Sequence, residues 1–544
     1  MFGIPINVVD VGLVDQVSIH EDHVHITILM FNRGRVYIDR AASPIRRHVR
    51  QLEQVKEVTV ECLWEKSWTP DRLSPTAREA LGFEPDDPPQ GQMHVRAQHK
   101  AASETEPVSQ RELKREQLCL AQPSLELAKL SRRKFHLWWG GWRFFKRFWL
   151  EETGGLSRHN EPIHLSVTFA ANQVRDMVRE IRLIDEATAT EIPCQIYNID
   201  KDGDTHSCQL VFLATVPAGV QQSYLLLHGN FSPACWAPLY ETDLITRGAE
   251  YALQIENYFY RTRLSPIMGQ LRNLEFKEWG KTQLGWENPS PINIVDAEND
   301  PQCELDIAWH GEDSCIHWNP DFRNQLRYRM TNWPKPPHYQ VVQGPLCTMV
   351  RRWGYPVCPT HPARDQAVVQ LDVTYIFYKD LPYFTMESRL QVEAATDILV
   401  VRNDEWLFRQ AFTHSLWMAE NGAIEENLAA KEVTFLENPA LVGFTNTTSG
   451  DAFTSLRLAY DARGFPGAYD PQLLTLGTTN YGNQIWSRDV FHAPGGKELA
   501  IQSGATIGEY NAYLCYNLGN PGGHQQAADY YAQLRCPLKV TAQH

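Results

Sequence analysis

The segment RNDEWLFRQAFTHSLW, residues 402 to 417, gathers side chains that could bind a sugar and move its protons. It contains Asp404, Glu405, Trp406, Arg409, His414 and Trp417. Carboxylates and imidazoles act as general acids and bases, and paired carboxylates can cleave a glycosidic bond. The alternative is a surface loop with a satisfied core histidine, although charged groups packed among large aromatic rings are costly without a purpose.

Two mechanisms fit this cluster. In an elimination, Arg351 or Arg409 would neutralise a uronate carboxylate. His414 or Tyr383 would then take the proton next to that carboxylate. In a hydrolysis, Glu405 and a second carboxylate, Asp404 or Glu387, would serve as acid and base.

Two further polar segments could take part. RRWGYPVCPTHPARD, from residue 351, offers Arg351, His361 and Arg364 for a carboxylate or a hydroxyl-rich ligand, or is simply a rigid loop. WHGEDSCIHWNPDFR, from residue 309, places His310 and His317 where a hairpin could bring them to one divalent metal ion. No tight spacing such as H-E-x-x-H supports that ion, and a polar hairpin end is the alternative. No other cofactor is indicated.

Several catalytic motifs are absent from the sequence. There is no G-x-S-x-G elbow, no phosphate-binding G-x-x-x-x-G-K-[ST] loop and no G-x-G-x-x-G after a predicted strand. Serine-elbow hydrolysis, nucleotide triphosphate use and nicotinamide binding are therefore disfavoured.

Length and composition indicate the number of domains and exclude some classes of partner. At 544 residues the chain exceeds what one hydrophobic core usually supports, so two or more domains are expected. The formal net charge of -14 argues against nucleic acid as a partner, since phosphate binding needs a basic face. We find no export signal and no apolar run long enough for a membrane span. The cysteines contain no C-x-x-C pair, which fits reduced thiols in the cytoplasm.

Residues 1–88 predict a small α+β domain. Alternating residues from 16 to 31 indicate a hairpin, the Ser43-Pro44 pair begins a helix, and 58–64 read as a strand. A second cap-and-proline pair at Ser74-Pro75 begins a short helix. The segments INVVDVGLVDQVSI and VTVECLWEKSWTPDRLSPTAREALGF then carry a resemblance to the PaaD-like, metal-sulfur cluster assembly family.

The resemblance implies a role in cluster assembly, but one family residue is missing. Family members carry a cysteine in a Gly-Cys-Pro turn after the second strand, and the matching segment here is MFNRGRVYIDRAASP. Only a thiolate could ligate iron there, and the remaining cysteine, Cys62, lies in an apolar strand. We therefore expect a docking or structural module, in which Asp10 ties down backbone amides.

Residues 89–158 predict a polar linker and then an aromatic and basic helical connector. RRKFHLWWGGWRFFKRFW, from residue 132, interleaves eight phenylalanine and tryptophan residues with arginines and lysines. An interfacial membrane helix, a sugar-stacking or anion-binding surface, and an inter-domain plug all remain open.

Residues 159–544 predict a large, mainly antiparallel β-sandwich, with or without a C-terminal subdomain. Short alternating segments separated by turn residues support this class. LQIENYFYRTRLSPIMGQLRNLEFKEWGK, from residue 253, resembles the galactose-mutarotase-like supersandwich domains of polysaccharide lyases and glycosidases. That resemblance implies a carbohydrate ligand.

We therefore expect a cytoplasmic, carbohydrate-active enzyme that cleaves a glycosidic linkage in an oligosaccharide or glycoside, by β-elimination or hydrolysis. Two alternatives stay open: an iron-sulfur or metalloprotein assembly factor with a scaffold sandwich, and a non-catalytic carbohydrate-binding protein. The expected partners are a carbohydrate, a protein docked on the N-terminal module and a second copy of the chain, but neither nucleic acid nor a membrane.

Overall fold

The structure is a computed structural model that describes two separate units, residues 1–98 and 99–544. The described residues are 9–10, 12–20, 22–29, 45–46, 48–50, 52, 54–63, 72, 74–75, 119–265, 269–277, 315–318, 321–323, 337–355, 368–408, 412–418, 422–428, 434–437, 439–465, 473–479, 482–492, 498–520 and 522–543. Within them, no helix combines the length and apolar character that crossing a bilayer requires.

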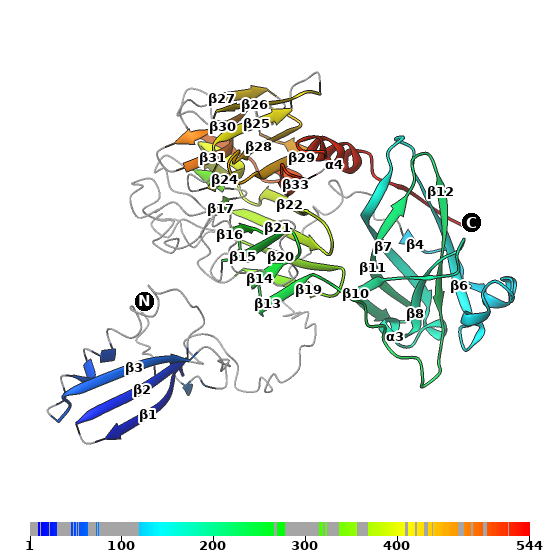
Figure 1. The fold of residues 1–544 in the computed structure, drawn as a ribbon, viewed down its shortest axis with the longest axis horizontal. Coiled ribbons are helices and arrows are strands. Elements are labelled where there is room, and N and C mark those ends of the chain that lie inside the picture. Colours follow the sequence, from blue (N-terminus) through cyan, green and yellow to red (C-terminus); the bar gives the residue numbers. More distant parts are fainter. Residues whose placement is uncertain are drawn as a thin grey trace. The chain divides into compact units, whose positions relative to one another are not determined.

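The first unit contains a three-stranded sheet, shown in blue in Figure 1. Its strands are β1 (Val14–His20), β2 (His23–Leu29) and β3 (Glu57–Leu63). β1 and β2 pair antiparallel as a hairpin, and β2 and β3 pair in parallel. Parallel pairing needs a crossover, and the helical residues 45–46 and 48–49 lie in it. The small α+β fold predicted for this unit is confirmed.

In the first unit, hydrogen bonds join Arg72 and Ser74 to the turn at Asp10 and to the start of β1. The Ser74 hydroxyl donates to Asp10 Oδ1 at 3.1 Å, and the Ser74 amide donates to the Asp10 carbonyl at 2.8 Å. Arg72 donates to Asp15 Oδ1 at 2.9 Å and to the Gly12 carbonyl at 3.1 Å. The residues around Ser74 are thereby fastened to the Asp10 turn, as expected of a residue with a structural role.

The second unit begins with a sandwich of two sheets (Figure 1). One sheet has the order β10-β11-β7-β4, with β4 (Cys119–Leu120), β7 (Arg158–Ala170), β10 (Cys194–Asp202) and β11 (Thr205–Val216). The other has the order β34-β6-β12-β8-β9, with β6 (Phe144–Glu151), β8 (Ile181–Asp185), β9 (Glu191–Ile192), β12 (Gln221–His228) and β34 (Lys539–Ala542); β5 (Leu125–Glu126) pairs with β6. Short helices are η3 (Leu127–Lys129), η4 (His136–Trp139), η5 (Ala171–Gln173) and α3 (Met177–Glu180).

The structure corrects the expectation of a helical connector in the aromatic and basic segment. Its second half is β6, a strand in the middle of a sheet. Phe145 packs against Phe135 on one face of that sheet, while Phe148 and Leu150 enter the core between the two sheets. Four of its eight residues are aromatic, and large apolar side chains directed to both faces are typical of a strand covered on both sides.

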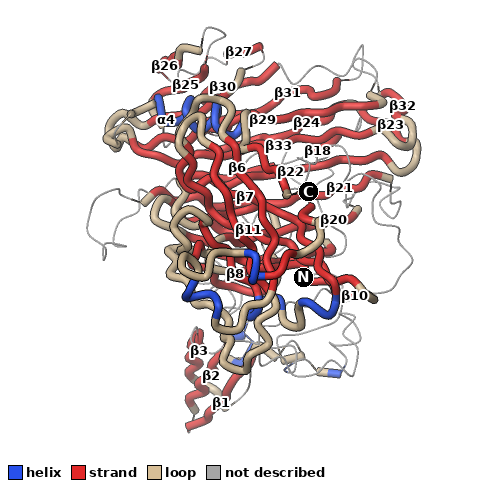
Figure 2. The backbone as a smooth tube through the Cα atoms, turned by 90° about the vertical axis from the view of Figure 1, so that its right-hand side faces the viewer, coloured by secondary structure: helices blue, strands red, loops and turns tan. Residues whose placement is uncertain are grey.

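The larger part of the second unit has four more sheets (Figure 2). A nine-stranded antiparallel sheet has the order β19 (His338–Gln343), β20 (Cys347–Gly354), β21 (Val369–Tyr378), β22 (Tyr383–Val392), β33 (Thr506–Asn517), β29 (Asp451–Arg463), β28 (Leu441–Thr445), β25 (His414–Met418) and β26 (Ile424–Leu428).

The other three sheets are smaller. A six-stranded sheet has the order β17 (Cys315–Trp318), β24 (Val400–Phe408), β31 (Gly482–His492), β30 (Leu473–Thr479) and β27 (Thr434–Glu437), with β18 (Asp321–Arg323) on β24. A four-stranded sheet runs β13 (Ile245–Ala249), β14 (Ala252–Glu256), β15 (Tyr260–Leu264) and β16 (Leu271–Phe276). A pair is formed by β23 (Thr396–Ile398) and β32 (Leu499–Ile501). The large antiparallel β-sandwich predicted from the sequence is confirmed.

The nine-stranded sheet is covered on both faces. Tyr375, Phe384 and Tyr513 face a core shared with β14 to β16 and β24. Leu514 and other residues of the opposite face pack against the first sandwich and the helix α4 (Gln525–Arg535). Charged side chains on the inner strands of this sheet are therefore taken out of water and need partners.

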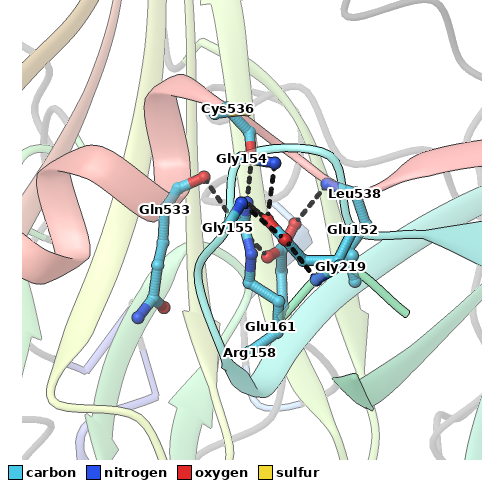
Figure 3. Close-up of polar contacts among 9 residues, drawn as sticks. All are labelled: Glu152, Gly154, Gly155, Arg158, Glu161, Gly219, Gln533, Cys536 and Leu538. Carbon is cyan, nitrogen blue, oxygen red and sulfur yellow. Dashed lines mark hydrogen bonds and ion pairs between the residues drawn. The ribbon is translucent and has the colours of Figure 1, made fainter. Parts of the chain in front are cut away.

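A buried arginine fastens the C-terminal segment to the first sandwich (Figure 3). Arg158 donates to Glu152 Oε1 at 2.8 Å and to Glu161 Oε2 at 2.9 Å. It also donates to the carbonyl oxygens of Gln533, at 2.8 Å, and Cys536, at 2.5 Å, around the end of α4. Burial alone would raise the pKa of Glu152, but hydrogen bonds from Arg158 and from backbone amides lower it to about 2. This cluster joins the end of the chain to the turn between β6 and β7.

Candidate functional site

An ionic network lies between β24 and the centre of the nine-stranded sheet, and its first member is Asp404. This residue interrupts the register of β24 with β31 and has a φ of 55°. A bulge of this kind redirects side chains, and aspartate tolerates the left-handed conformation better than most residues. Asp404 and Trp406 both contact Tyr513 of the nine-stranded sheet.

Four donors hold the Asp404 carboxylate. Tyr513 donates to Oδ1 at 2.5 Å and the Trp406 indole donates to the same oxygen at 3.0 Å. The Ser455 hydroxyl donates to Oδ2 at 3.0 Å, and Arg457 Nη1 lies 3.4 Å from that oxygen. The carboxylate is 0% exposed, so these groups replace its water shell completely.

Arg457 connects Asp404 to a second buried carboxylate. Its Nη2 donates to Glu509 Oε1 at 2.8 Å, and Asn511 donates to Glu509 Oε2 at 3.3 Å. Burial raises the pKa of Glu509 to about 7, although Arg457 opposes that shift. Glu509 therefore keeps its proton to a higher pH than an exposed glutamate does.

The network brings an acid and a second carboxylate to one guanidinium. Paired carboxyl groups whose environments differ are the arrangement used for acid and base roles in glycoside cleavage. Among the described members of the network, Arg457 keeps the largest exposure, 9% of its side chain, and therefore marks the side nearest to solvent.

The sequence-predicted residues of β24 lie in or beside this network. Asp404 and Trp406 belong to it directly. Glu405 is 1% exposed and lies opposite Trp318 of β17. Trp406 also stacks on Phe408, with ring centroids 5.7 Å apart, so it is a core residue and offers no free face to a ligand.

His414 and Tyr383 are not brought to the Asp404 network. His414 lies on β25, and its neighbour on the same face, Leu416, packs into the core on the α4 side. Its Nδ1 is 2.9 Å from the Thr413 hydroxyl. Tyr383 is 2% exposed, packs against Tyr530, and has a pKa raised well above its usual range by burial. Both residues therefore face away from Asp404.

The other described candidates for substrate binding, Trp417 and Arg351, are already engaged in contacts within the fold. Trp417 packs against the core beneath β25. Arg351 donates to Asp372 at 2.7 Å and covers the ring of Trp353 at 4.7 Å, so its charge is already paired. The remaining predicted ligand-binding residues, Arg409, His361 and Arg364, lie outside the described residues.

Only one of the two predicted metal ligands, His317, lies among the described residues. His317 lies on β17, and its backbone pairs with Trp406, while His310 is outside the described residues. Within the described part of the chain, no group of three or more His, Cys, Asp or Glu side chains is placed to hold a metal ion.

Sequence reasoning missed Arg457, Glu509 and Tyr513, although a signal existed. Arg457 and Glu509 occupy inward positions of alternating apolar strands, TSLRLAY and TIGEYNAYLCY. A charged residue at such a position must find a buried partner. The partners are about 50 residues apart in the chain, so the pattern alone could not pair them.

No family model matches the chain. A curated relative, the Fe-S protein maturation auxiliary factor YitW of Bacillus subtilis (strain 168), is 30% identical over 80 residues, or 14% of this chain and 78% of the relative. The solved Domain of Unknown Function DUF59 from Bacillus anthracis is 24% identical, covers 15% of this chain and 81% of its own, and has a TM-score of 0.14.

Two solved structures are similar to the β-rich part. A glycosyl hydrolase family 38 protein from Enterococcus faecalis is 10% identical, with 74% of this chain and 47% of the other covered and a TM-score of 0.43. A protein assigned as an aldose 1-epimerase from Klebsiella pneumoniae is 10% identical, with 53% and 84% covered and a TM-score of 0.33. This chain therefore spans about half of the family 38 protein, and TM-scores this low establish no shared activity.

The chain is a two-unit protein in which a small α+β unit precedes a large antiparallel β-sandwich; its structural neighbours include glycoside hydrolase and galactose-mutarotase-like sandwiches. Through its N-terminal region it belongs to the family of YitW, in agreement with the PaaD-like resemblance of its first motifs.

Proposed function

We propose that this protein is a carbohydrate-active enzyme that hydrolyses a glycosidic linkage, with Glu509 as the acid and Asp404 as the second carboxylate. The observation that carries this proposal is their shared guanidinium, because Arg457 contacts both carboxylates and the pKa of Glu509 is about 7. A carboxyl group that keeps its proton near neutral pH can donate it to a leaving oxygen. The second carboxylate can activate water or stabilise the charge on the sugar ring.

The geometry favours hydrolysis over elimination. Elimination needs a base at the carbon next to a uronate carboxylate, and the two residues proposed for it, His414 and Tyr383, face away from Asp404. Burial also raises the pKa of Tyr383 well above its usual range, so the phenol stays protonated and cannot accept a proton from the substrate. Two carboxyl groups beside one arginine meet the needs of hydrolysis without those residues.

The proposal requires access to a closed site, since Asp404 and Glu509 are both 0% exposed. A sugar reaches them only if the side chains around Arg457 move when it binds. The competing role is purely structural, because buried ion networks can also serve to join two sheets. The two roles differ in their response to neutral isosteres, which remove acid chemistry while keeping most of the shape.

The test is a panel of neutral and uronate-containing oligosaccharides, followed for new reducing ends and for the ultraviolet band of an unsaturated product. We expect reducing ends without that band. Glu509→Gln and Asp404→Asn should each lower turnover by at least about a hundredfold. Glu425→Gln is the matched control, because Glu425 is an exposed glutamate on β26.

Three outcomes would overturn the proposal. Full turnover by Glu509→Gln would remove the acid assignment. An ultraviolet band without hydrolysis would replace hydrolysis by elimination. Binding of a saccharide with no product at all would leave the non-catalytic carbohydrate-binding function.

The relationship to YitW supports a second function for the first unit, namely docking to a protein partner. The unit keeps its packing around Asp10 and Ser74, but the sequence has no cysteine between 30 and 44, where the family cysteine is expected. We expect full-length protein purified without oxygen to contain no stoichiometric iron or sulfide. Stoichiometric iron with a visible charge-transfer band would restore a role in cluster assembly.

We also propose that the protein acts in the cytoplasm. Seven of the cysteines among the described residues are free thiols, namely Cys119, Cys194, Cys208, Cys235, Cys347, Cys515 and Cys536. Free thiols are typical of reducing compartments. Localisation of a tagged full-length protein by fractionation tests this assignment, and recovery outside the cytoplasm would contradict it.

A further inference from the structure

A second feature that could bind a ligand lies on the first sandwich, remote in sequence from Asp404. It is a hollow of about 240 Å³ between the start of α3 and the segment that follows β12. Its walls include Arg175, Asp176, Arg179, Asn230, Phe231 and Ser232. This volume is somewhat below the roughly 300–1,000 Å³ of pockets for drug-sized ligands, so it suits one sugar residue.

Two arginines lie near Phe231, an aromatic residue of this hollow: Arg175 lines the hollow itself, and Arg143 lies beside it on the ring of Phe231. The guanidinium carbons of Arg143 and Arg175 lie 4.8 Å and 4.4 Å from the ring centroid of Phe231. Both arginines are exposed, and neither forms an ion pair with another described residue. Two cations that each lie within 5 Å of one ring centroid raise the local positive potential, so an anion bound beside them would be stabilised.

The acidic side chains of the hollow are already engaged. Asp176 accepts the backbone amides of Val178 and Arg179, at 3.1 and 3.2 Å. The buried Glu180 carboxylate accepts the amides of Arg175 and Asp176, at 3.0 and 3.3 Å. These carboxylates therefore stabilise the local backbone and do not pair with the two arginines on Phe231.

The opposite wall is fixed by Arg179. Its Nε donates to the Cys235 carbonyl at 2.8 Å, and its Nη2 donates to the Pro233 carbonyl at 3.2 Å. The same guanidinium covers the ring of Trp236, 5.8 Å from the centroid, and Trp236 is 75% exposed. Trp236 follows Cys235 of the hollow in the chain, and its exposed indole gives a sugar ring a surface to stack on.

We propose that this hollow binds the carboxylate-bearing residue of an acidic oligosaccharide, with Arg143 and Arg175 holding the carboxylate and Trp236 contacting the sugar ring. Guanidinium groups suit this task because they bind carboxylates through paired hydrogen bonds. The carboxylate assignment rests on the hollow alone, whereas the saccharide assignment rests on the proposed function.

Calorimetric titration of the full-length protein with trigalacturonate tests the proposal. We expect binding that weakens by about tenfold or more in the double variant Arg143→Gln/Arg175→Gln. Arg133→Gln is the control, since Arg133 is also exposed but is not part of the hollow. Trp236→Ala should weaken trigalacturonate without changing the binding of free acetate.

Each competing result has a defined meaning. Equal binding of trigalacturonate and its methyl ester, or an unchanged affinity in the double variant, would overturn the carboxylate assignment. Acetate or sulfate alone binding as tightly as trigalacturonate would overturn the saccharide assignment. Glu509→Gln should bind trigalacturonate like the wild type, so failure of the hydrolase proposal and failure of this one are distinguishable.

Discussion

The phenol of Tyr513 donates a 2.5 Å hydrogen bond to Oδ1 of Asp404, which joins the centre of the nine-stranded sheet to the bulge in β24. Both residues are 0% exposed, so no water competes for the bond. The contact couples two sheets through one charged group, and loss of the phenol would remove one of the four donors to Asp404.

Tyr513→Phe removes the hydroxyl and keeps the ring. We expect the free energy of unfolding to fall by about 1–3 kcal/mol, because a buried carboxylate loses one of its donors. Urea denaturation followed by tryptophan fluorescence measures this change. Tyr258→Phe, at an exposed tyrosine, should have almost no effect, and equal losses in the two variants would contradict the assigned role.

Arg158→Met breaks the buried cluster that holds the C-terminal segment. We expect a loss of about 3–5 kcal/mol, because Glu152 and Glu161 remain buried without their cation. The control is Lys539→Met, which removes a partly exposed pair with Glu151 at 3.8 Å and should cost no more than about 1 kcal/mol. Chemical denaturation compares the two variants, and similar losses would refute the role of the cluster.

Glu509 should give stability an unusual dependence on pH. Its pKa rises from 4.5 to about 7 on folding, so between these values the folded protein holds a proton that the unfolded chain releases. This contribution to stability is full below pH 4.5 and is lost as the pH rises towards 7. Stability measured from pH 4.5 to 7.5 should therefore decline more in the wild type than in Glu509→Gln. Hydrolysis should decline above pH 7 for the same reason, and parallel stability curves would refute the raised pKa.

His228 should make the protein less stable as the pH falls, which is the opposite of the effect of Glu509. Burial, with a smaller effect of the Lys146 charge, lowers the pKa of His228 from 6.5 to about 3. Below pH 6.5 His228 binds a proton in the unfolded chain but stays neutral in the folded protein. The free energy of unfolding therefore decreases as the pH falls towards 3. His228→Phe keeps the aromatic packing against Phe144 and Phe169 and should reduce that loss. Melting temperatures from pH 7.5 to 4.5 measure it, and an unchanged slope would argue against a neutral buried histidine.

The strands of the large sandwich could be predicted because apolar and polar residues alternate along each strand, which indicates that one face is buried. AVVQLDVTYIFY and YFTMESRLQV alternate in the sequence, and they form β21 and β22. The segment around Phe145 misled the prediction, because a strand covered on both faces loses its alternation and resembles any other apolar run.

The candidate site was only half predictable. Asp404 and Trp406 are neighbours in the chain, so their local cluster was visible in one segment. His414 stands in that same segment, yet it lies on another strand and faces the other way. Side-chain direction depends on strand register, which a single segment does not contain.

The amino-acid order by itself determined the small α+β character of the first unit, its resemblance to the PaaD-like family and the strand-rich class of the remainder, because composition, alternation and local motifs are properties of short stretches. Only the tertiary structure decided that Asp404 meets Tyr513, Arg457 and Glu509, and that Arg143 and Arg175 share the ring of Phe231. These groups come from strands and turns far apart in the chain, and their meeting depends on sheet order and register.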